Sequence, residues 1–195
     1  MAICSQTLGG ISLDCTTSQG GIKAAWIADY NSVVPSIAKV TPDKNTLFNG
    51  NTDEYKKVTG FTYTETGATF ADTFKKYEFR RGTASMTETH TADETTGNNY
   101  VTQELSLVFT KKDTAKRVEM AALTVGQLAV ILLDNNGKYW YMGADDYVSA
   151  SAGGSESGTA KGDRNAYTIT LKTESATFAY EVDANLFAPK TETEE

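Results

Sequence analysis

Apolar and polar residues alternate most regularly between residues 100 and 112, in the stretch YVTQELSLVFTKK. One face of an extended chain collects the apolar residues and the other face collects polar ones: Val101, Leu105, Leu107 and Phe109 against Thr102, Glu104 and Ser106. A period of two is typical of a strand that buries one side and exposes the other. The stretch therefore predicts a half-buried strand of about ten residues.

The spacing changes immediately after this strand. Residues Ala115, Val118, Ala122 and Val125 recur at helical intervals, which indicates an amphipathic helix over about 111–125. Asp113 is placed to cap or charge the amino end, and Gly126 is placed to stop the helix. This is the single helix that the sequence predicts.

A hairpin is expected over residues 131–143, ILLDNNGKYWYMG. Asn136-Gly137 suits a type I′ turn, in which both central residues have positive φ, and apolar and aromatic runs flank it. Alternation places Trp140 opposite Tyr139 and Tyr141. A sugar-stacking platform is one interpretation of these rings, but core packing is the preferred one.

The remaining segments fit a mainly β protein. A first strand is expected within residues 20–33, with Trp26 and Ile27 available for the core, and two β segments are expected around Gly82. Residues 166–182 predict a further pair of strands. We expect long loop insertions at about 35–60, where Pro and Asn-Gly recur, and at 149–165, which is rich in Gly and Ser. The order predicts a β-sandwich or barrel with one flanking helix.

Composition sets the size of the fold and the partners that it suits. The 195 residues are 39% hydrophobic and 10% aromatic, which predicts one domain, 1–195, with an acidic C-terminal tail. The net charge of −7 argues against tight binding to phosphate backbones, which depends on clustered Lys and Arg.

The cysteines and the amino terminus bear on the compartment. Cys4 and Cys15 are the only cysteines, and with one histidine they do not complete a four-ligand zinc site, so reduced thiols or one disulfide are expected. The amino terminus lacks the pattern of a secretory signal, and no run reaches the roughly 20 apolar residues of a membrane span. Synthesis and folding in the cytoplasm, without membrane contact, are expected.

Catalytic residue types are scarce. His90, the sole histidine, lies in the polar stretch TETHTADE, and no nucleophile elbow accompanies it. The segment GGSESGTAKGD lacks the ending of a phosphate-binding loop. Asp134, Asp145, Asp146 and Asp163 lie near turns without the spacing of a calcium loop. We expect no enzyme activity and no cofactor or metal; a glycosidase with two distant carboxylates is the enzyme alternative.

The order of helix, apolar strand, Asn-Gly turn, KYWYMGA and GTAKGDRNAYTITL resembles structural proteins of tailed bacteriophages of gut bacteria, over about residues 100–182. GGIKAAWIADY is also similar to the start of such proteins, while 35–60 has no counterpart. The resemblance implies a tail tube subunit in the virion, assembled in the host cytoplasm into stacked hexameric rings. Its partners would be copies of itself, other tail proteins and, transiently in the lumen, genomic DNA.

A negative subunit suits a DNA conduit, because like charges keep the duplex from adhering to the wall. Glu88, Glu104 and Glu174 are candidates for lumen-facing acids, with a solvated outer face as the alternative for each. The sequence is compatible with two other functions. One is a head-tail connector ring of a short-tailed phage, and the other is a carbohydrate- or surface-binding β-sandwich module.

Overall fold

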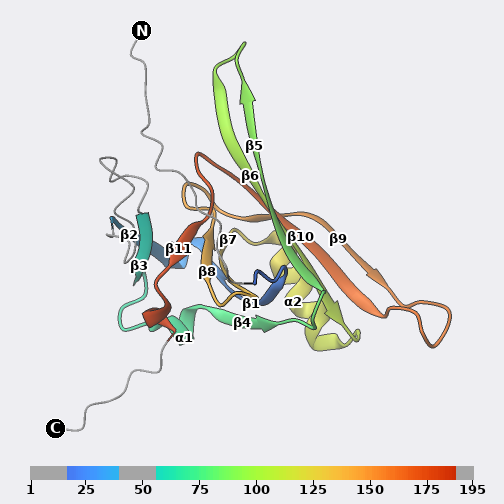
Figure 1. Ribbon diagram of the computed structural model, residues 1–195. Helices are drawn as coiled ribbons and strands as arrows, with labels where there is room; N and C mark the ends of the chain where they lie inside the picture. Colours follow the sequence, from blue (N-terminus) through green and yellow to red (C-terminus); the bar gives the residue numbers. More distant parts are fainter. Residues whose placement is uncertain (1–16, 40–55, 188–195) are drawn as a thin grey trace.

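Two sheets, in which most neighbouring strands are antiparallel, form the body of the protein, as the alternating patterns predict (Figure 1). The computed structural model describes residues 17–39 and 56–187. Sheet A has the order β2-β3-β11-β8-β7-β1-β4 and sheet B the order β5-β6-β10-β9. The strands of sheet A are β1 (Ile22–Asp29), β2 (Val33–Lys39), β3 (Lys56–Tyr63), β4 (Lys75–Glu78), β7 (Leu128–Asp134), β8 (Tyr139–Met142) and β11 (Tyr180–Val182). Sheet B consists of β5 (Ala84–Asp93), β6 (Asn98–Thr110), β9 (Ser149–Glu156) and β10 (Ala166–Ser175), and the helices are α1 (Phe70–Thr73) and α2 (Thr114–Val125).

The main core lies between the two sheets. Its centre on sheet B is formed by alternate residues of β6 and β10, which are at most 1% exposed: Leu105, Leu107, Ile169 and Leu171. They belong to one apolar cluster with Val130 and Leu132 of sheet A. The predicted strand over 100–112 therefore buries the apolar face that its sequence indicates.

A second cluster lies on the other face of sheet A. Its buried members come from six strands of that sheet and from the segment after α1: Ala28, Val33, Val58, Phe74, Ala129, Ile131, Tyr141 and Val182. A short 3₁₀ turn, Tyr30–Ser32, links β1 to β2, although four strands lie between them in the sheet order. Such a link reaches about 14 Å, whereas five strand spacings in a flat sheet span about 24 Å. Sheet A therefore curls around the second cluster.

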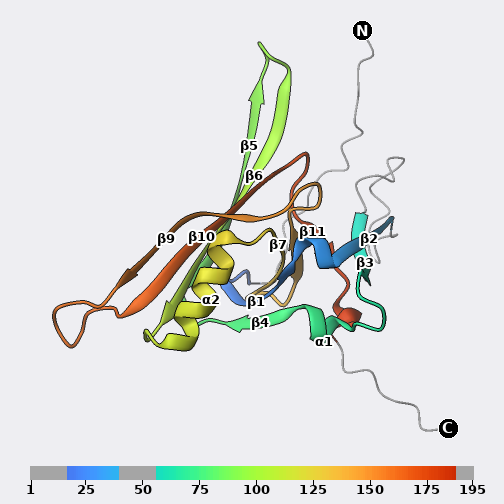
Figure 2. The same ribbon diagram turned by 180° about the vertical axis from the view of Figure 1, so that it is seen from behind.

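Helix α2 has the predicted ends but buries a different face. The Asp113 carboxylate accepts a hydrogen bond from the backbone N–H of Lys116 at 2.8 Å, and the helix stops at Gly126. Its buried residues are Met120 and Leu123, whereas Val118 and Val125 are 57% and 86% exposed. The expected apolar stripe is thus on the outside, because the longer Met and Leu side chains fill the core beneath β9 and β10 (Figure 2).

A loop insertion was expected at 35–60, but the described residues at each side of this segment form strands, β2 and β3. Residues of β2 and β3 pair in antiparallel register from Val33↔Tyr63 to Lys39↔Lys56, while 40–55 lie outside the described residues. Pro35 fits because β2 is an edge strand, where a missing N–H removes no ladder bond on the open side. Cys4, Cys15 and the acidic tail 188–195 also lie outside the described residues.

The Gly/Ser-rich segment at 149–165 likewise begins with a strand. Strand β9 pairs with β10, and Gly153 and Gly154 lie opposite Ile169 and Thr168. Backbone hydrogen bonds to β10 order this segment, so it needs no apolar side chains of its own. Only the part after Glu156 is a loop, which Asp163 organises by accepting the N–H groups of Thr159 and Ala160, each at 2.7 Å.

The hairpin of β7 and β8 forms where it was expected, with a different turn. The backbone N–H of Asp134 donates to the Lys138 carbonyl at 3.0 Å, which leaves a three-residue loop. Gly137 alone adopts positive φ, at 83°, so the turn is not type I′. The aromatic residues pack in the interior: Tyr141 is fully buried, and the Trp140 indole N–H donates to Asp134 at 3.1 Å.

Gln103 is a buried polar residue that the alternating pattern concealed. Its side chain is fully buried on the apolar face of β6. The side-chain oxygen accepts the N–H of Gly143 at 3.0 Å, and the side-chain nitrogen donates to the Thr177 carbonyl at 3.1 Å. Gln103 therefore joins the loops after β8 and β10 to the centre of sheet B.

Replacing Gln103 by Leu should lower the free energy of unfolding by about 2–4 kcal/mol, because it leaves the buried N–H of Gly143 without a partner and removes the donor to the partly buried Thr177 carbonyl. Chemical denaturation monitored by circular dichroism measures this change. Glu104→Gln, at the neighbouring exposed position, is the control and should stay within about 0.5 kcal/mol of the wild type. Equal stability of Gln103→Leu and the control would contradict the role of the amide.

Candidate assembly surfaces

The outer face of sheet B is a broad polar surface. Residues that point away from sheet A are half-buried or exposed, and most of them are Thr or Ser: Ser85, Thr87, Thr89, Thr102, Glu104, Ser106, Thr168, Thr170, Lys172 and Glu174. Lys172 pairs with Glu174 at 2.9 Å, and this contact raises the pKa of the lysine. The face is thus nearly neutral and hydroxyl-rich.

Two of the three acids proposed for a lumen share this face. Glu104 and Glu174 lie on it. Glu88 does not, because it pairs in register with the buried Gln103 and so points to the inner side of the sheet. Its carboxylate accepts the N–H of Ala179 at 2.7 Å. We therefore correct the sequence interpretation of Glu88 to a structural role at the edge of the core.

Strands β5 and β9 form the two edges of sheet B. Neither has a second strand partner within the described residues, so each presents a row of backbone donors and acceptors. Most residues of β9 are exposed and have small side chains. A Cβ at Gly153 or Gly154 would meet only ordinary contacts, at 3.7 and 3.5 Å. The β9 edge is therefore open to close approach by another strand.

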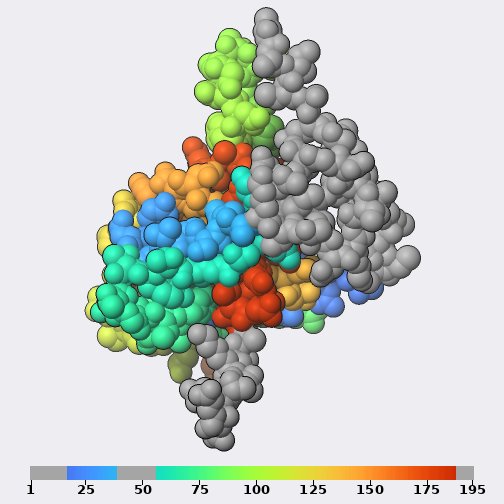
Figure 3. Space-filling model, turned by 90° about the vertical axis from the view of Figure 1, so that its left-hand side faces the viewer, coloured from blue at the N-terminus to red at the C-terminus, as the bar shows by residue number. Residues whose placement is uncertain are grey.

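The β5–β6 hairpin extends beyond the sandwich as an arm (Figures 1 and 3). Residues 87–90 and 92–99, which form its outer part, are exposed. At its tip Asp93 accepts the N–H of Thr95 at 2.8 Å, and Gly97 adopts a φ of 74°. These turn contacts give the exposed arm a defined end.

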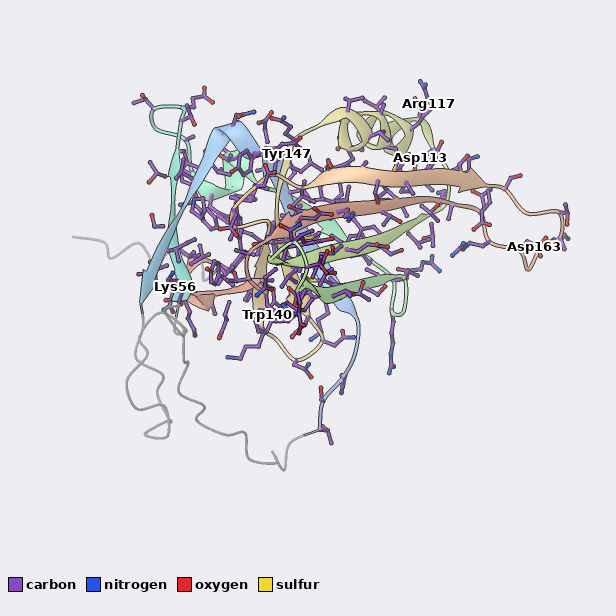
Figure 4. All side chains as sticks on the ribbon, turned by 90° about the horizontal axis from the view of Figure 1, so that it is seen from above. Lys56, Asp113, Arg117, Trp140, Tyr147 and Asp163 are labelled. Atoms are coloured by element: carbon purple, nitrogen blue, oxygen red, sulfur yellow. The ribbon has the colours of Figure 1, made fainter. Side chains whose placement is uncertain are left out.

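The charged residues are sorted along the long axis of sheet B. The basic end comprises residues 79–83, 110–119 and 156–165, which hold eight Lys or Arg against four Asp or Glu. Backbone hydrogen bonds hold these segments around the end of β6: the N–H of Val108 in β6 donates to the Thr83 carbonyl at 3.0 Å, and the N–H of Lys111 donates to the Asn165 carbonyl at 2.8 Å. Figure 4 shows Asp113, Arg117 and Asp163 on this side of the molecule.

The acidic end comprises residues 87–99, 144–147 and 174–179, with six Asp or Glu and no Lys or Arg. Hydrogen bonds bring these segments together at the base of the arm. The Ser175 hydroxyl donates to Asp145 at 2.7 Å, and the Ala179 N–H donates to Glu88 at 2.7 Å. The sequence interpretation treated these charges separately and missed their sorting, because it appears only when hairpins bring distant segments together.

Residues considered for catalysis are placed in structural contacts or in solvent. His90 is exposed on the arm and contacts Asn99. The four turn aspartates each accept hydrogen bonds from neighbouring parts of the fold, as Asp145 does from Ser175 and Ala176. Within 17–39 and 56–187, no three His, Cys, Asp or Glu side chains gather as a metal site. No helix of the described chain has both the length and the apolar character to cross a bilayer.

An aromatic groove of about 1150 Å³ lies on the outer side of the second cluster. Trp26, Tyr139, Phe70 and Phe187 line it, together with Lys23 and other residues of β1, β4 and α1. The rings of Tyr139 and Phe187 stack at 3.9 Å, and Phe187 lies 4.9 Å from Trp26. The rings therefore pack on one another, and the stacked pair covers one face of Tyr139 and one face of Phe187.

No protein-family model matches the chain, and the searches of curated proteins and of solved structures found no match either. The features of the molecule that bear on function are its surfaces: the two edges of sheet B, its polar outer face, the arm and the two charged ends.

Glu88 offers a test of the contacts at the base of the arm. Although the residue as a whole is exposed, the Glu88 carboxylate is partly desolvated at the base of the arm, which raises the pKa of its carboxyl above the usual 4.5; the hydrogen bond from the Ala179 N–H only partly opposes this. Because the folded pKa is raised, the charged form costs stability above the folded pKa, and the cost disappears below the unfolded value. Glu88→Gln should therefore raise Tm at neutral pH, with a gain that shrinks as pH falls toward 4.

Thermal unfolding at a series of pH values measures this difference. Glu174→Gln on the exposed outer face is the matched control and should show a smaller pH-dependent change. If the difference in Tm between Glu88→Gln and the wild type is the same at every pH, burial of the carboxylate does not cost stability.

Proposed function

We propose that the protein is a structural subunit of a bacteriophage tail tube, which forms closed rings by pairing β9 of one copy with β5 of the next. The supporting observation is that sheet B has one open strand at each edge. Its strands alternate in direction, so β9 and β5 run in opposite senses. A neighbour related by rotation about an axis roughly along the strands would therefore continue the sheet as antiparallel pairs.

Edge lengths and surface chemistry agree with this pairing. Strand β5 has 10 residues and β9 has 8, so a ladder can run along most of both edges. The exposed β9 edge has small side chains that do not obstruct a neighbour. Heterologous contacts of this kind give a closed ring when the rotation per copy closes, and the sequence resemblance implies a hexamer.

The outer face of sheet B would line the lumen of such a ring. Its Thr and Ser hydroxyls are small and neutral, and Lys172 is neutralised by Glu174. Glu104 adds negative charge, which repels the phosphate backbone. DNA could then pass without a strong binding site. Self-association is the principal activity in this proposal, and other tail proteins would contact the ends of the tube.

The wild-type chain should form rings or tubes, visible by negative-stain electron microscopy and as a large species in sedimentation. Gly153→Lys combined with Gly154→Lys should abolish rings while the fold remains, because charged side chains on an edge strand oppose pairing. Circular dichroism would check the fold. Gly20→Lys, at a site with open space around it, is the control and should assemble normally.

A wild type that remains monomeric at high concentration contradicts the proposal. If that monomer also binds a glycan array, the carbohydrate-binding module becomes the better function. Rings of twelve copies would instead favour the connector of a short-tailed phage. Ring formation by the Gly153→Lys and Gly154→Lys double variant would show that copies meet through another surface.

A further inference from the structure

The acidic and basic ends lie at opposite extremes of sheet B. Strand β6 runs from the arm to the basic end over 13 residues, Asn98–Thr110. At about 3.3 Å per residue, the basic end lies roughly 25 Å from the acids at the base of the arm, where Glu88 and Glu174 pair opposite Gln103 and Thr102, and roughly 40 Å from the tip of the arm. Both separations exceed the Debye length of about 8 Å at physiological salt. The two charges therefore do not neutralise each other within one copy.

Much of the charge at the basic end has no partner within the described chain. Lys116 pairs with Asp113 at 2.8 Å, and Arg164 pairs with Glu156. Lys112 is half-buried and donates a hydrogen bond to the Ser155 hydroxyl at 3.1 Å. The five remaining cations are exposed and make no ion pair within the described residues: Arg80, Arg81, Lys111, Arg117 and Lys161. These exposed cations are available to another molecule.

The acidic end has unpaired charge and an apolar centre. Glu94 and Asp146 make no ion pair within the described residues and are exposed. Phe178 is 54% exposed in the same end, next to Ala179, whose N–H holds Glu88. At the basic end Val118 is 57% exposed beside Arg117. An exposed apolar side chain within a charged surface is the usual anatomy of a protein interface.

We propose that the acidic end of one copy docks on the basic end of the next, so that copies join head to tail along the direction of β6. The contact deepens the proposed function, on which it rests, by adding an axial interface to the lateral pairing of β9 and β5. Because its two surfaces differ and the copies translate along the axis, the contact does not close. It extends a stack of rings with one polarity.

A second copy fits these surfaces better than a nucleic acid does. The basic end contains four acids among its eight cations, which is a mixed surface that repels a continuous phosphate backbone at several points. Each copy also supplies the complementary acidic surface at equal concentration. A nucleic acid would leave the acidic end, with its exposed Phe178, without a partner.

Charge reversal at each end tests the contact. Arg80→Glu with Arg81→Glu should leave single rings that no longer stack, and so should Glu94→Lys with Asp146→Lys. Combining all four substitutions in one chain restores complementarity, so stacks should form again. These stacks should exclude wild-type rings. The control Lys75→Glu with Lys76→Glu changes the same number of charges on β4 and should stack normally.

Electron microscopy and sedimentation velocity in 50 and 500 mM salt distinguish the outcomes. Wild-type stacking should weaken about tenfold or more over this range, because exposed charges carry the contact. In the Gly153→Lys and Gly154→Lys background, which should lack rings, linear oligomers should persist at low salt. That background isolates the end-to-end contact from the lateral one.

Normal stacking of either double variant overturns the inference, and so does failure of the fourfold variant to recover while it remains folded by circular dichroism. Wild-type rings that never stack overturn the end-to-end contact, whereas the lateral pairing of β9 with β5 would stand. A wild type that stays monomeric overturns both. If the wild type binds a labelled DNA duplex, and the variant with Arg80→Glu and Arg81→Glu loses this binding but still stacks, the basic end is assigned to nucleic acid.

Discussion

The packing of alternate β6 and β10 residues against sheet A is the interaction on which the rest of the structure depends. Leu105 and Leu107 lie in register with Leu171 and Ile169, and all four are essentially inaccessible to solvent. A shift of one residue in either strand would turn these side chains outward, so the core fixes the register. The same register directs the Thr and Ser residues away from the body, and it sets which acids can reach the outer face.

Local sequence patterns predicted the elements whose burial depends on their own side chains. The alternation from Val101 to Phe109 and the Asp113 and Gly126 boundaries of α2 are confirmed. The pattern did not predict β9, because backbone bonds to β10 order it and glycine carries no side-chain signal. The pattern also failed to identify the buried face of α2. The apolar residues that include Val118 and those that include Met120 both recur at helical spacing, so the spacing does not distinguish the two faces. Glu88 was misplaced because its orientation depends on pairing with Gln103.

The two proposed contacts between copies rest on different physics. Edge pairing uses backbone hydrogen bonds, which are available along the whole length of β5 and β9 and are independent of sequence. Docking of the ends uses exposed ionic groups, whose attraction depends on ionic strength. One chain could therefore form rings under conditions that keep those rings apart. The order of assembly would then be set by the solution rather than by a separate factor.

Sheet A separates the only two tryptophans of the chain. Trp26 belongs with the cluster inside the curl of the sheet, and Trp140 belongs with the core between the sheets. Intrinsic fluorescence consequently contains one emitter for each layer. Replacing either indole with phenylalanine would leave a chain whose emission follows the loosening of a single layer, which allows the cooperativity between the layers to be observed without an attached dye.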